Sequence, residues 1–231
     1  MNKHAVVTLD INNYNKDITD ITFPRMRQYA NNIGADFICI TEQKTPELAI
    51  SLEKFQLYDI ADNYEWIIFL DADCLIDPNT IDFTTLENDI VVVPSYNDVT
   101  HHFTTEKILG KYELDYYMPF FFLAFHSQNK NCVKPWKDIS ELEKYINMDT
   151  KTPDFVYYKN VRNDLEINPS WLLDELILDI NIIKYGISTL SIREDFNFNV
   201  ICHSIGSVEE KIQGLTAQNK KIDLHWELSY D

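Results

Sequence analysis

Glycine is scarce in this sequence. Only 5 of the 231 residues are glycine, whereas an average composition of about 7% would supply roughly 16. A loop of several closely spaced glycines, which is one common way to hold a phosphate, is therefore not expected. Each glycine that does occur becomes a stronger indication of a turn, a helix end or a close approach of the backbone.

Positive charge is also in short supply. The 20 lysines and arginines face 37 aspartates and glutamates, which gives a formal net charge of −17 at pH 7. This balance argues against non-specific binding of nucleic acid and against docking on an anionic membrane, since both depend on cationic side chains. It does not exclude phosphate ligands, because a bound divalent metal ion can reverse the local field.

Paired cysteines and long apolar runs are absent as well. The four cysteines form no C-x-x-C pair, which favours buried free thiols over disulfides or a zinc site. No apolar run approaches the roughly 18 residues of a membrane span. The N-terminal sequence MNKHAVVTLDINNY becomes polar too soon for a signal peptide. We therefore expect a soluble, cytoplasmic protein without a membrane span.

The apolar runs that are present alternate with helical patterns. Strands are predicted at 5–9, 36–41, 66–70, 90–93, 118–125, 187–192 and 200–201, and helices at 18–33, 45–61, 140–147 and 169–185. Gly34 and Gly186 fit helix C-terminal caps, and Thr45 fits an N-cap. The β-α-β-α-β order of the first half is typical of an α/β fold with a ligand site at the strand ends. We predict one domain over 1–231, with a mixed, mostly parallel central sheet flanked by helices.

The clearest chemical signal is the segment WIIFLDADCLID. Its apolar run, 66–70, is typical of a strand buried on both faces, and it delivers Asp71 and Asp73 to the end of that strand. Hard cations such as Mg²⁺ and Mn²⁺ prefer carboxylate oxygens and bridge them to phosphates. The alternative is a solvated turn at the strand end, because D-x-D by itself is common.

FLDAD, together with the H-x-x-G segment His203 to Gly206, resembles glycosyltransferases with the GT-A fold, especially family 8. The resemblance implies that Asp71, Asp73 and His203 bind Mn²⁺ or Mg²⁺, and that Gly206 lets the backbone approach the phosphates of a nucleotide sugar. His225 is the alternative third ligand. Where the family continues with Lys-Pro-Trp, this chain has Glu-Glu-Lys, so the nearest candidate for the phosphate-binding lysine is Lys211.

The resemblance also implies contacts to the donor. Thr8, Asp10 and Tyr14, at the end of the first predicted strand, would contact the base and ribose, although Asp10 could equally be an aspartate that begins a loop. Ala72 lies between the two acids, and Lys54 lies where the family places a basic residue near the donor. A solvated helix lysine is the alternative for Lys54.

Asp174 and Glu175 are the candidate catalytic residues. In the family, an acidic or amide pair at this place faces the donor sugar and the reacting carbon, and either residue could be the general base of an inverting enzyme. Helix-dipole stabilisation of acids in a first turn is the structural alternative. The run 119–125 would line an aromatic acceptor pocket, although so apolar a run is more often core.

The acidic pair and the resemblance together predict a metal-dependent glycosyltransferase, a hexosyltransferase, and the resemblance to family 8 implies that it retains the anomeric configuration. It would move a sugar from a nucleotide-diphosphate sugar, with UDP-sugars the default, to a glycan or other hydroxyl acceptor. Residues 1–95 would form the nucleotide-sugar-binding half and 96–231 the acceptor half. One alternative is a haloacid-dehalogenase-type phosphatase with Asp71 as nucleophile, against which Leu75 and the depth of the motif in the chain both count. A non-catalytic nucleotide-sugar binder is another.

Overall fold

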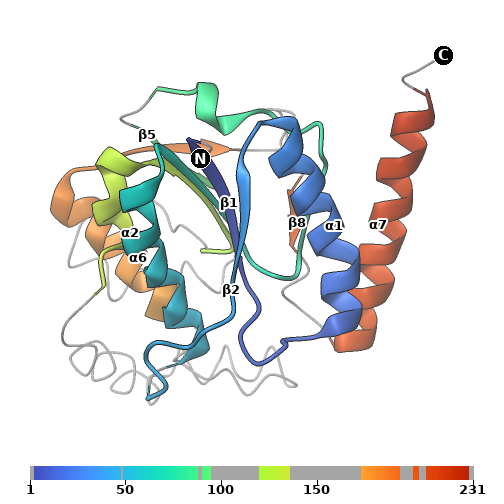
Figure 1. The fold of residues 1–231 in the computed structure, drawn as a ribbon, viewed down its shortest axis with the longest axis horizontal. Coiled ribbons are helices and arrows are strands. Elements are labelled where there is room, and N and C mark those ends of the chain that lie inside the picture. The colour runs from blue at the N-terminus through green and yellow to red at the C-terminus, as the bar shows by residue number, and fades with distance from the viewer. Residues whose placement is uncertain are drawn as a thin grey trace, which may run out of the picture.

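The computed structural model describes residues 3–47, 49–87, 90–94, 120–135, 173–192, 200–202 and 207–228. Within these residues the centre is a six-stranded sheet of order β2-β1-β3-β6-β5-β7 (Figure 1). The strands are β1 (His4–Leu9), β2 (Asp36–Ile40), β3 (Trp66–Leu70), β5 (Ile90–Pro94), β6 (Phe122–His126) and β7 (Ser188–Ile192). The β1–β2, β1–β3 and β5–β7 pairs are parallel, and β6 is antiparallel to both of its neighbours. The predicted α/β fold with a mixed, mostly parallel sheet is confirmed.

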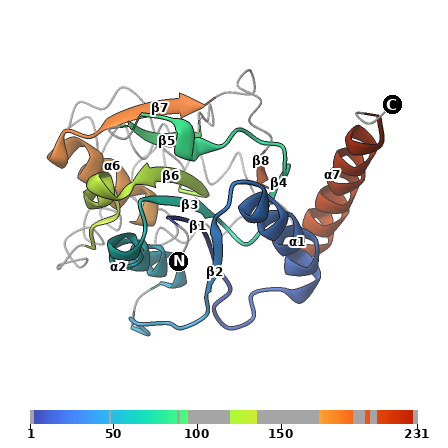
Figure 2. The same ribbon diagram turned by 45° about the horizontal axis from the view of Figure 1, so that its top comes forward.

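Helices cover both faces of this sheet (Figure 2). On one side lie α1 (Lys16–Asn32) and α7 (Val208–Leu228), and on the other lie η1 (Ile50–Gln56), α2 (Leu57–Ile60) and α6 (Leu173–Tyr185). Shorter 3-10 turns are η2 (Ala61–Asn63), η3 (Phe83–Thr85) and η4 (Ser127–Val133). A small antiparallel pair, β4 (Cys74–Ile76) with β8 (Val200–Cys202), stands apart from the main sheet. No helix in the described ranges is both long and apolar enough to cross a membrane.

Strand β3 is buried from end to end, as its unbroken apolar run predicts. Successive side chains point to opposite faces of a strand. Ile67 and Phe69 accordingly belong to the core under α6, together with Ile177. Ile68 and Leu70 belong to the core under α1. Burial of both faces fixes the position of β3. Asp71, the residue directly after this strand, therefore lies at the C-terminal edge of the sheet.

Helix α1 forms where its sequence predicts, although it begins earlier. The Asn15 side chain accepts the backbone N–H groups of Asp17 (3.0 Å) and Ile18 (3.3 Å), which otherwise have no partner in a first turn. Gly34 follows the helix end with a φ of +68°, the left-handed conformation expected after a C-terminal cap.

The helix predicted at 45–61 is partly wrong. Helical turns begin only at Ile50, as 3-10 turns, and continue as α-helix from Leu57. Thr45 is not an N-cap. Its N–H and its hydroxyl both donate to the carboxylate of Glu53, at 2.7 and 2.5 Å. Glu53 is only 2% exposed, and these bonds join it to the loop that precedes the helical turns. The turns begin after Ala49, whose side chain makes no capping hydrogen bond, so Thr45 lies too early in the chain to cap them.

Strand β6 begins at Phe122, later than predicted, because Phe120 and Phe121 form a turn. Helix α6 forms over Leu173–Tyr185, and the predicted helical residues 169–172 lie outside the described residues. Helix α7 was not predicted at all, although Ser207 and Glu210 form a capping box. Glu210 accepts the Ser207 N–H at 2.7 Å, and the Ser207 hydroxyl accepts the Glu210 N–H at 3.3 Å. The S-V-E-E sequence was therefore an available signal. The helix predicted at 140–147 lies outside the described residues. Cys39, Cys74 and Cys132 are free thiols, as expected.

Candidate functional site

The turn after β3 presents two acidic side chains on a rigid backbone. The Asp71 N–H donates to the Phe121 carbonyl at 2.8 Å, and the Cys74 N–H donates to the Asp71 carbonyl at 2.9 Å. The Ala72 carbonyl, predicted to lie beside the nucleotide, accepts the Thr22 hydroxyl at 2.6 Å. The turn is thus held both by α1 and by the segment that leads into β6.

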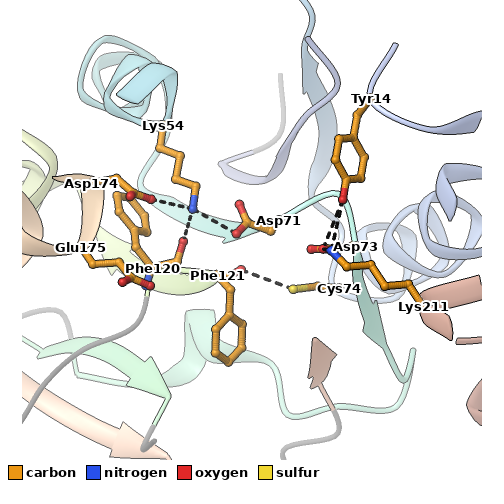
Figure 3. Close-up of polar contacts among 10 residues, drawn as sticks. All are labelled: Tyr14, Lys54, Asp71, Asp73, Cys74, Phe120, Phe121, Asp174, Glu175 and Lys211. Carbon is orange, nitrogen blue, oxygen red and sulfur yellow. Dashed lines mark hydrogen bonds and ion pairs between the residues drawn. The ribbon is translucent and has the colours of Figure 1, made fainter. Parts of the chain in front are cut away.

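Lys54 is the centre of the first group of contacts (Figure 3). Its ammonium lies 3.0 Å from Asp71 Oδ2 and 2.8 Å from Asp174 Oδ2, and it donates to the Phe120 carbonyl at 2.6 Å. The Lys54 side chain is only 8% exposed, so the alternative of a solvated helix lysine is wrong. Three acceptors from three different segments therefore converge on one buried cation.

Asp174 and Glu175 lie together in the first turn of α6. Asp174 is 2% exposed and faces Lys54, whereas Glu175 Oε1 accepts the Phe120 N–H at 3.3 Å. The Phe120 peptide is therefore held at both ends, by Lys54 at its carbonyl and by Glu175 at its N–H. The Phe120 ring is fully buried against Phe69, with ring centroids 5.4 Å apart. Nothing in the sequence indicates this role of Phe120, because every residue type has the same backbone N–H and carbonyl groups.

Asp73 belongs to a second group on the side of α1 and α7. Its Oδ2 lies 2.9 Å from the Lys211 ammonium, and Lys211 also contacts the Tyr14 hydroxyl at 3.4 Å. The Tyr14 hydroxyl is 3.5 Å from Asp73 Oδ2. The structure thus brings Tyr14, Asp73 and Lys211 together, as Figure 3 shows.

Four acidic side chains and two lysines make up the two groups within the described residues. The acids are Asp71, Asp73, Asp174 and Glu175, and the lysines are Lys54 and Lys211. Burial raises the pKa of Asp71 to about 7; nearby Lys54 opposes this, and Asp73 adds to it. Burial likewise raises the pKa of Glu175 to about 7, again with Lys54 opposing. The raised pKa values of Asp71 and Glu175 therefore reflect burial, which disfavours the charged form of a carboxyl group.

The pKa of Lys54 is raised too, but for a lysine this favours the charged form. Burial by itself works against its charged form, but the neighbouring Asp174 and Asp71 carboxylates outweigh burial and raise its pKa. Lys54 therefore stays protonated. The pKa of Asp174 is raised by burial, which Lys54 opposes.

The residues present partly fit a divalent cation. In the described parts of the chain there is no group of three or more histidine, cysteine or acidic side chains placed to hold a metal. Asp71 and Asp73 nevertheless supply two carboxylates, and Mg²⁺ commonly uses one or two carboxylates with waters and substrate phosphates as its remaining ligands. His203 and Gly206 lie outside the described residues. His225 lies in α7, and its side chain is likewise outside them.

The remaining predicted donor contacts lie at the end of β1. Thr8 is fully buried, and its hydroxyl has no hydrogen-bond partner among the described residues. Asp10 accepts the Tyr14 N–H at 2.9 Å across a loop in which Asn12 and Asn13 have positive φ angles of 62° and 52°. A cavity of about 520 Å³ opens beside Asp10 and continues along α1 past Phe23 and Arg27. Asp10 and Tyr14 therefore connect the Asp73 group to this cavity.

Comparison with known proteins adds only distant structural resemblance. No family model and no curated protein matches the sequence. A glycosyltransferase involved in the glycosylation of the major capsid of PBCV-1 is similar over 92% of this chain and 99% of its own, at 12% identity and a TM-score of 0.48. The catalytic domain of Drosophila beta1,4-galactosyltransferase 7, in complex with xylobiose, is similar over 57% and 52%, at 13% identity and a TM-score of 0.38.

The glycosyltransferase GlyE of Streptococcus pneumoniae is similar over 82% of this chain and 45% of its own, at 14% identity and a TM-score of 0.37. This chain thus spans about half the length of the last two structures. Identities and TM-scores this low say nothing of what the chain catalyses. Any function has to be supported by its own residues.

Proposed function

We propose that the chain is a metal-dependent glycosyltransferase that moves a sugar, a hexose by our hypothesis, from a nucleotide-diphosphate sugar to a carbohydrate or other hydroxyl acceptor. The observation that carries this proposal is the Asp71–Asp73 pair at the end of buried β3, with an ammonium group against each carboxylate. Clustered oxygen donors and cations at one edge of an α/β sheet suit a diphosphate and its counter-ion. A UDP-sugar is the first donor to test.

The site would promote sugar transfer by electrostatic stabilisation of the leaving group. A divalent cation on Asp71 and Asp73, Mn²⁺ by preference, would neutralise the charge that develops on the leaving diphosphate. Lys211 would add a direct ammonium contact to the same phosphates. Tyr14 and Asp10 extend from this point along the end of β1, where Asp10 could accept hydroxyl groups of the ribose. His203 or His225 would complete the metal site.

Lys54, Asp174 and Glu175 would lie beside the sugar of the donor. Lys54 holds Asp71 and Asp174 in one ionic group, so the metal-binding carboxylate and α6 cannot move independently. Glu175 fixes the Phe120 peptide beneath them. We propose a retaining reaction, in which no base is needed at the acceptor. In an inverting reaction, Asp174 or Glu175 would be the base.

The test is nucleotide release from a panel of nucleotide sugars with Mn²⁺, with and without EDTA. Release from one donor, lost with EDTA and restored by excess Mn²⁺, supports the proposal. Asp73→Asn should abolish release, whereas Asp62→Asn, in the exposed turn that precedes β3, should leave it unchanged. Folded protein that releases nucleotide from no donor would contradict it. Saturable donor binding without turnover would point to a binding protein, and a beryllofluoride adduct on Asp71 to a phosphatase.

A further inference from the structure

Each carboxylate of the Asp71–Asp73 pair already has its own lysine. Lys54 lies against Asp71, and Lys211 lies 2.9 Å from Asp73 Oδ2. The second pair is shielded from water, since the Lys211 and Asp73 side chains are 13% and 12% exposed. The oxygens predicted to bind a divalent cation therefore carry ammonium groups when the cation is absent.

The two lysines are held very differently. Lys54 has three acceptors, namely Asp71, Asp174 and the Phe120 carbonyl. The structure gives Lys211 fewer contacts, one at 2.9 Å to Asp73 Oδ2 and a longer one at 3.4 Å to the Tyr14 hydroxyl. A cation that approaches the pair would therefore displace Lys211 far more readily than Lys54.

The backbone of α7 at Lys211 is held in place, whereas the Lys211 side chain can change its conformation. The capping box of Ser207 and Glu210 fixes the first turn of α7. Further along, Leu215 packs against Ile18 of α1, and Arg25 donates to Asn219 at 2.7 Å. A lysine ammonium sits on a flexible four-carbon stem, so Lys211 can change partner without any movement of α7.

We propose that Lys211 is the resident counter-ion of Asp73, which an arriving divalent cation displaces and thereby frees for the donor diphosphate. This inference rests on the proposed function, because it takes the cation and the diphosphate to be ligands of this site. Two positive groups cannot share one carboxylate without repulsion, so Lys211 and the cation compete. Once displaced, Lys211 is an unpaired cation beside the metal, where it attracts the diphosphate. Cation binding and nucleotide binding are thereby coupled, and the coupling is reciprocal.

The test is calorimetric titration of the full chain with Mn²⁺ alone, which reads metal affinity without any turnover. Lys211→Met removes the competing charge and should tighten Mn²⁺ binding about tenfold, within the usual range of about 5- to 150-fold for coupled sites. Lys211→Arg keeps the charge and should stay close to the wild type. Lys220→Met, at an exposed position on the same helix, is the matched control and should change nothing. Lys211→Gln is a second uncharged variant, should Lys211→Met fail to fold.

The titration is then repeated with saturating UDP, after correction for the Mn²⁺–UDP complex in free solution. UDP should tighten Mn²⁺ binding by a larger factor in the wild type than in Lys211→Met. Only in the wild type can the Lys211 ammonium leave Asp73 and form an ion pair with the UDP phosphates. Equal or weaker Mn²⁺ binding by folded Lys211→Met overturns the inference and leaves the proposed function standing. Absence of Mn²⁺ binding in every protein, with or without UDP, contradicts the proposed function itself, and the inference with it.

Discussion

The Lys54 ammonium lies 2.8 Å from Asp174 Oδ2, and both side chains are more than nine-tenths buried. The two residues come from distant segments, η1 and the first turn of α6, which meet over one face of the sheet. Asp71 shares the same ammonium at 3.0 Å. A single lysine therefore ties the acidic turn after β3 to α6, and this tie should matter for stability as well as for function.

Lys54→Met should destabilise the protein strongly. Removing one partner of a buried ion pair typically costs about 3–5 kcal/mol, because the other charge stays buried without compensation. Here two carboxylates would lose their partner, although Asp71 is 25% exposed and can be partly hydrated. Urea unfolding would measure the loss.

The control for this prediction is Lys16→Met. Lys16 pairs with Asp20 on the surface, where both side chains are more than half exposed, and such pairs contribute about 0–1 kcal/mol. If Lys54→Met lost no more stability than Lys16→Met, the buried ionic group would have no structural role.

Glu53→Gln should lower the free energy of unfolding at neutral pH, and lower it much less in acid. The Glu53 carboxylate accepts the N–H groups of Lys44 and Thr45 and the Gln56 amide. Burial opposes its charged form, but these hydrogen bonds outweigh burial and lower its pKa. The stabilisation is therefore present above the unfolded pKa of about 4.3 and is lost as pH falls through the lower folded value. We expect a loss of about 1.5–3 kcal/mol at pH 7, as for hydrogen bonds to a charged group.

Urea unfolding at pH 7 and at pH 3 tests this prediction, with exposed Glu87→Gln as the matched control. The difference between wild type and Glu53→Gln should shrink at pH 3, whereas Glu87→Gln should match the wild type at both pH values. A loss in Glu53→Gln that does not depend on pH would contradict the prediction.

Glu175→Gln should show the opposite dependence on pH. Burial raises the pKa of Glu175 to about 7, so the folded protein binds this proton more tightly than the unfolded chain does. Wild-type stability should then fall as pH rises from about 4.3 to about 7, by less than about 1.4 kcal/mol per pH unit because the residue is partly exposed. Glutamine keeps an oxygen for the Phe120 N–H but cannot ionise. The free energy of unfolding of Glu175→Gln should therefore rise relative to that of the wild type as pH increases from about 4.3 to about 7. Urea unfolding of both proteins from pH 5 to pH 8 measures this difference. A difference in unfolding free energy that stays constant over this pH range would contradict the prediction.

Metal and nucleotide together should stabilise the folded protein, and chelation should reverse the effect. At a ligand concentration 100 times its dissociation constant, binding to the folded state alone adds about 2.7 kcal/mol. Thermal unfolding with Mn²⁺ and UDP should therefore give a higher Tm than protein with EDTA. Asp73→Asn should lose most of this increase, whereas exposed Asp62→Asn should keep it. An increase that survives in Asp73→Asn would place the ligand elsewhere.

Several features followed from local sequence, because the signals that encode them are local. An apolar run such as 66–70 predicts a buried strand, and the two acids that follow it must then lie at the sheet edge. Gly34 marked the end of α1 because its positive φ suits glycine. The failure at Thr45 shows the limit of such reasoning. The N-cap pattern was present, but the helical turns begin only at Ile50, and Thr45 instead donates to buried Glu53 from the preceding loop.

An α/β layer, a buried β3 and an acidic pair at its end can all be derived from the order of the residues. The folded chain was needed to reveal that Lys54 is shared by Asp71 and Asp174 and that Lys211 of α7 reaches Asp73. The same holds for β6, which runs antiparallel between β3 and β5. This difference follows from the range of the interactions. Periodicity and capping involve neighbours along the chain, whereas the partner of a buried charge depends on which distant segments pack together.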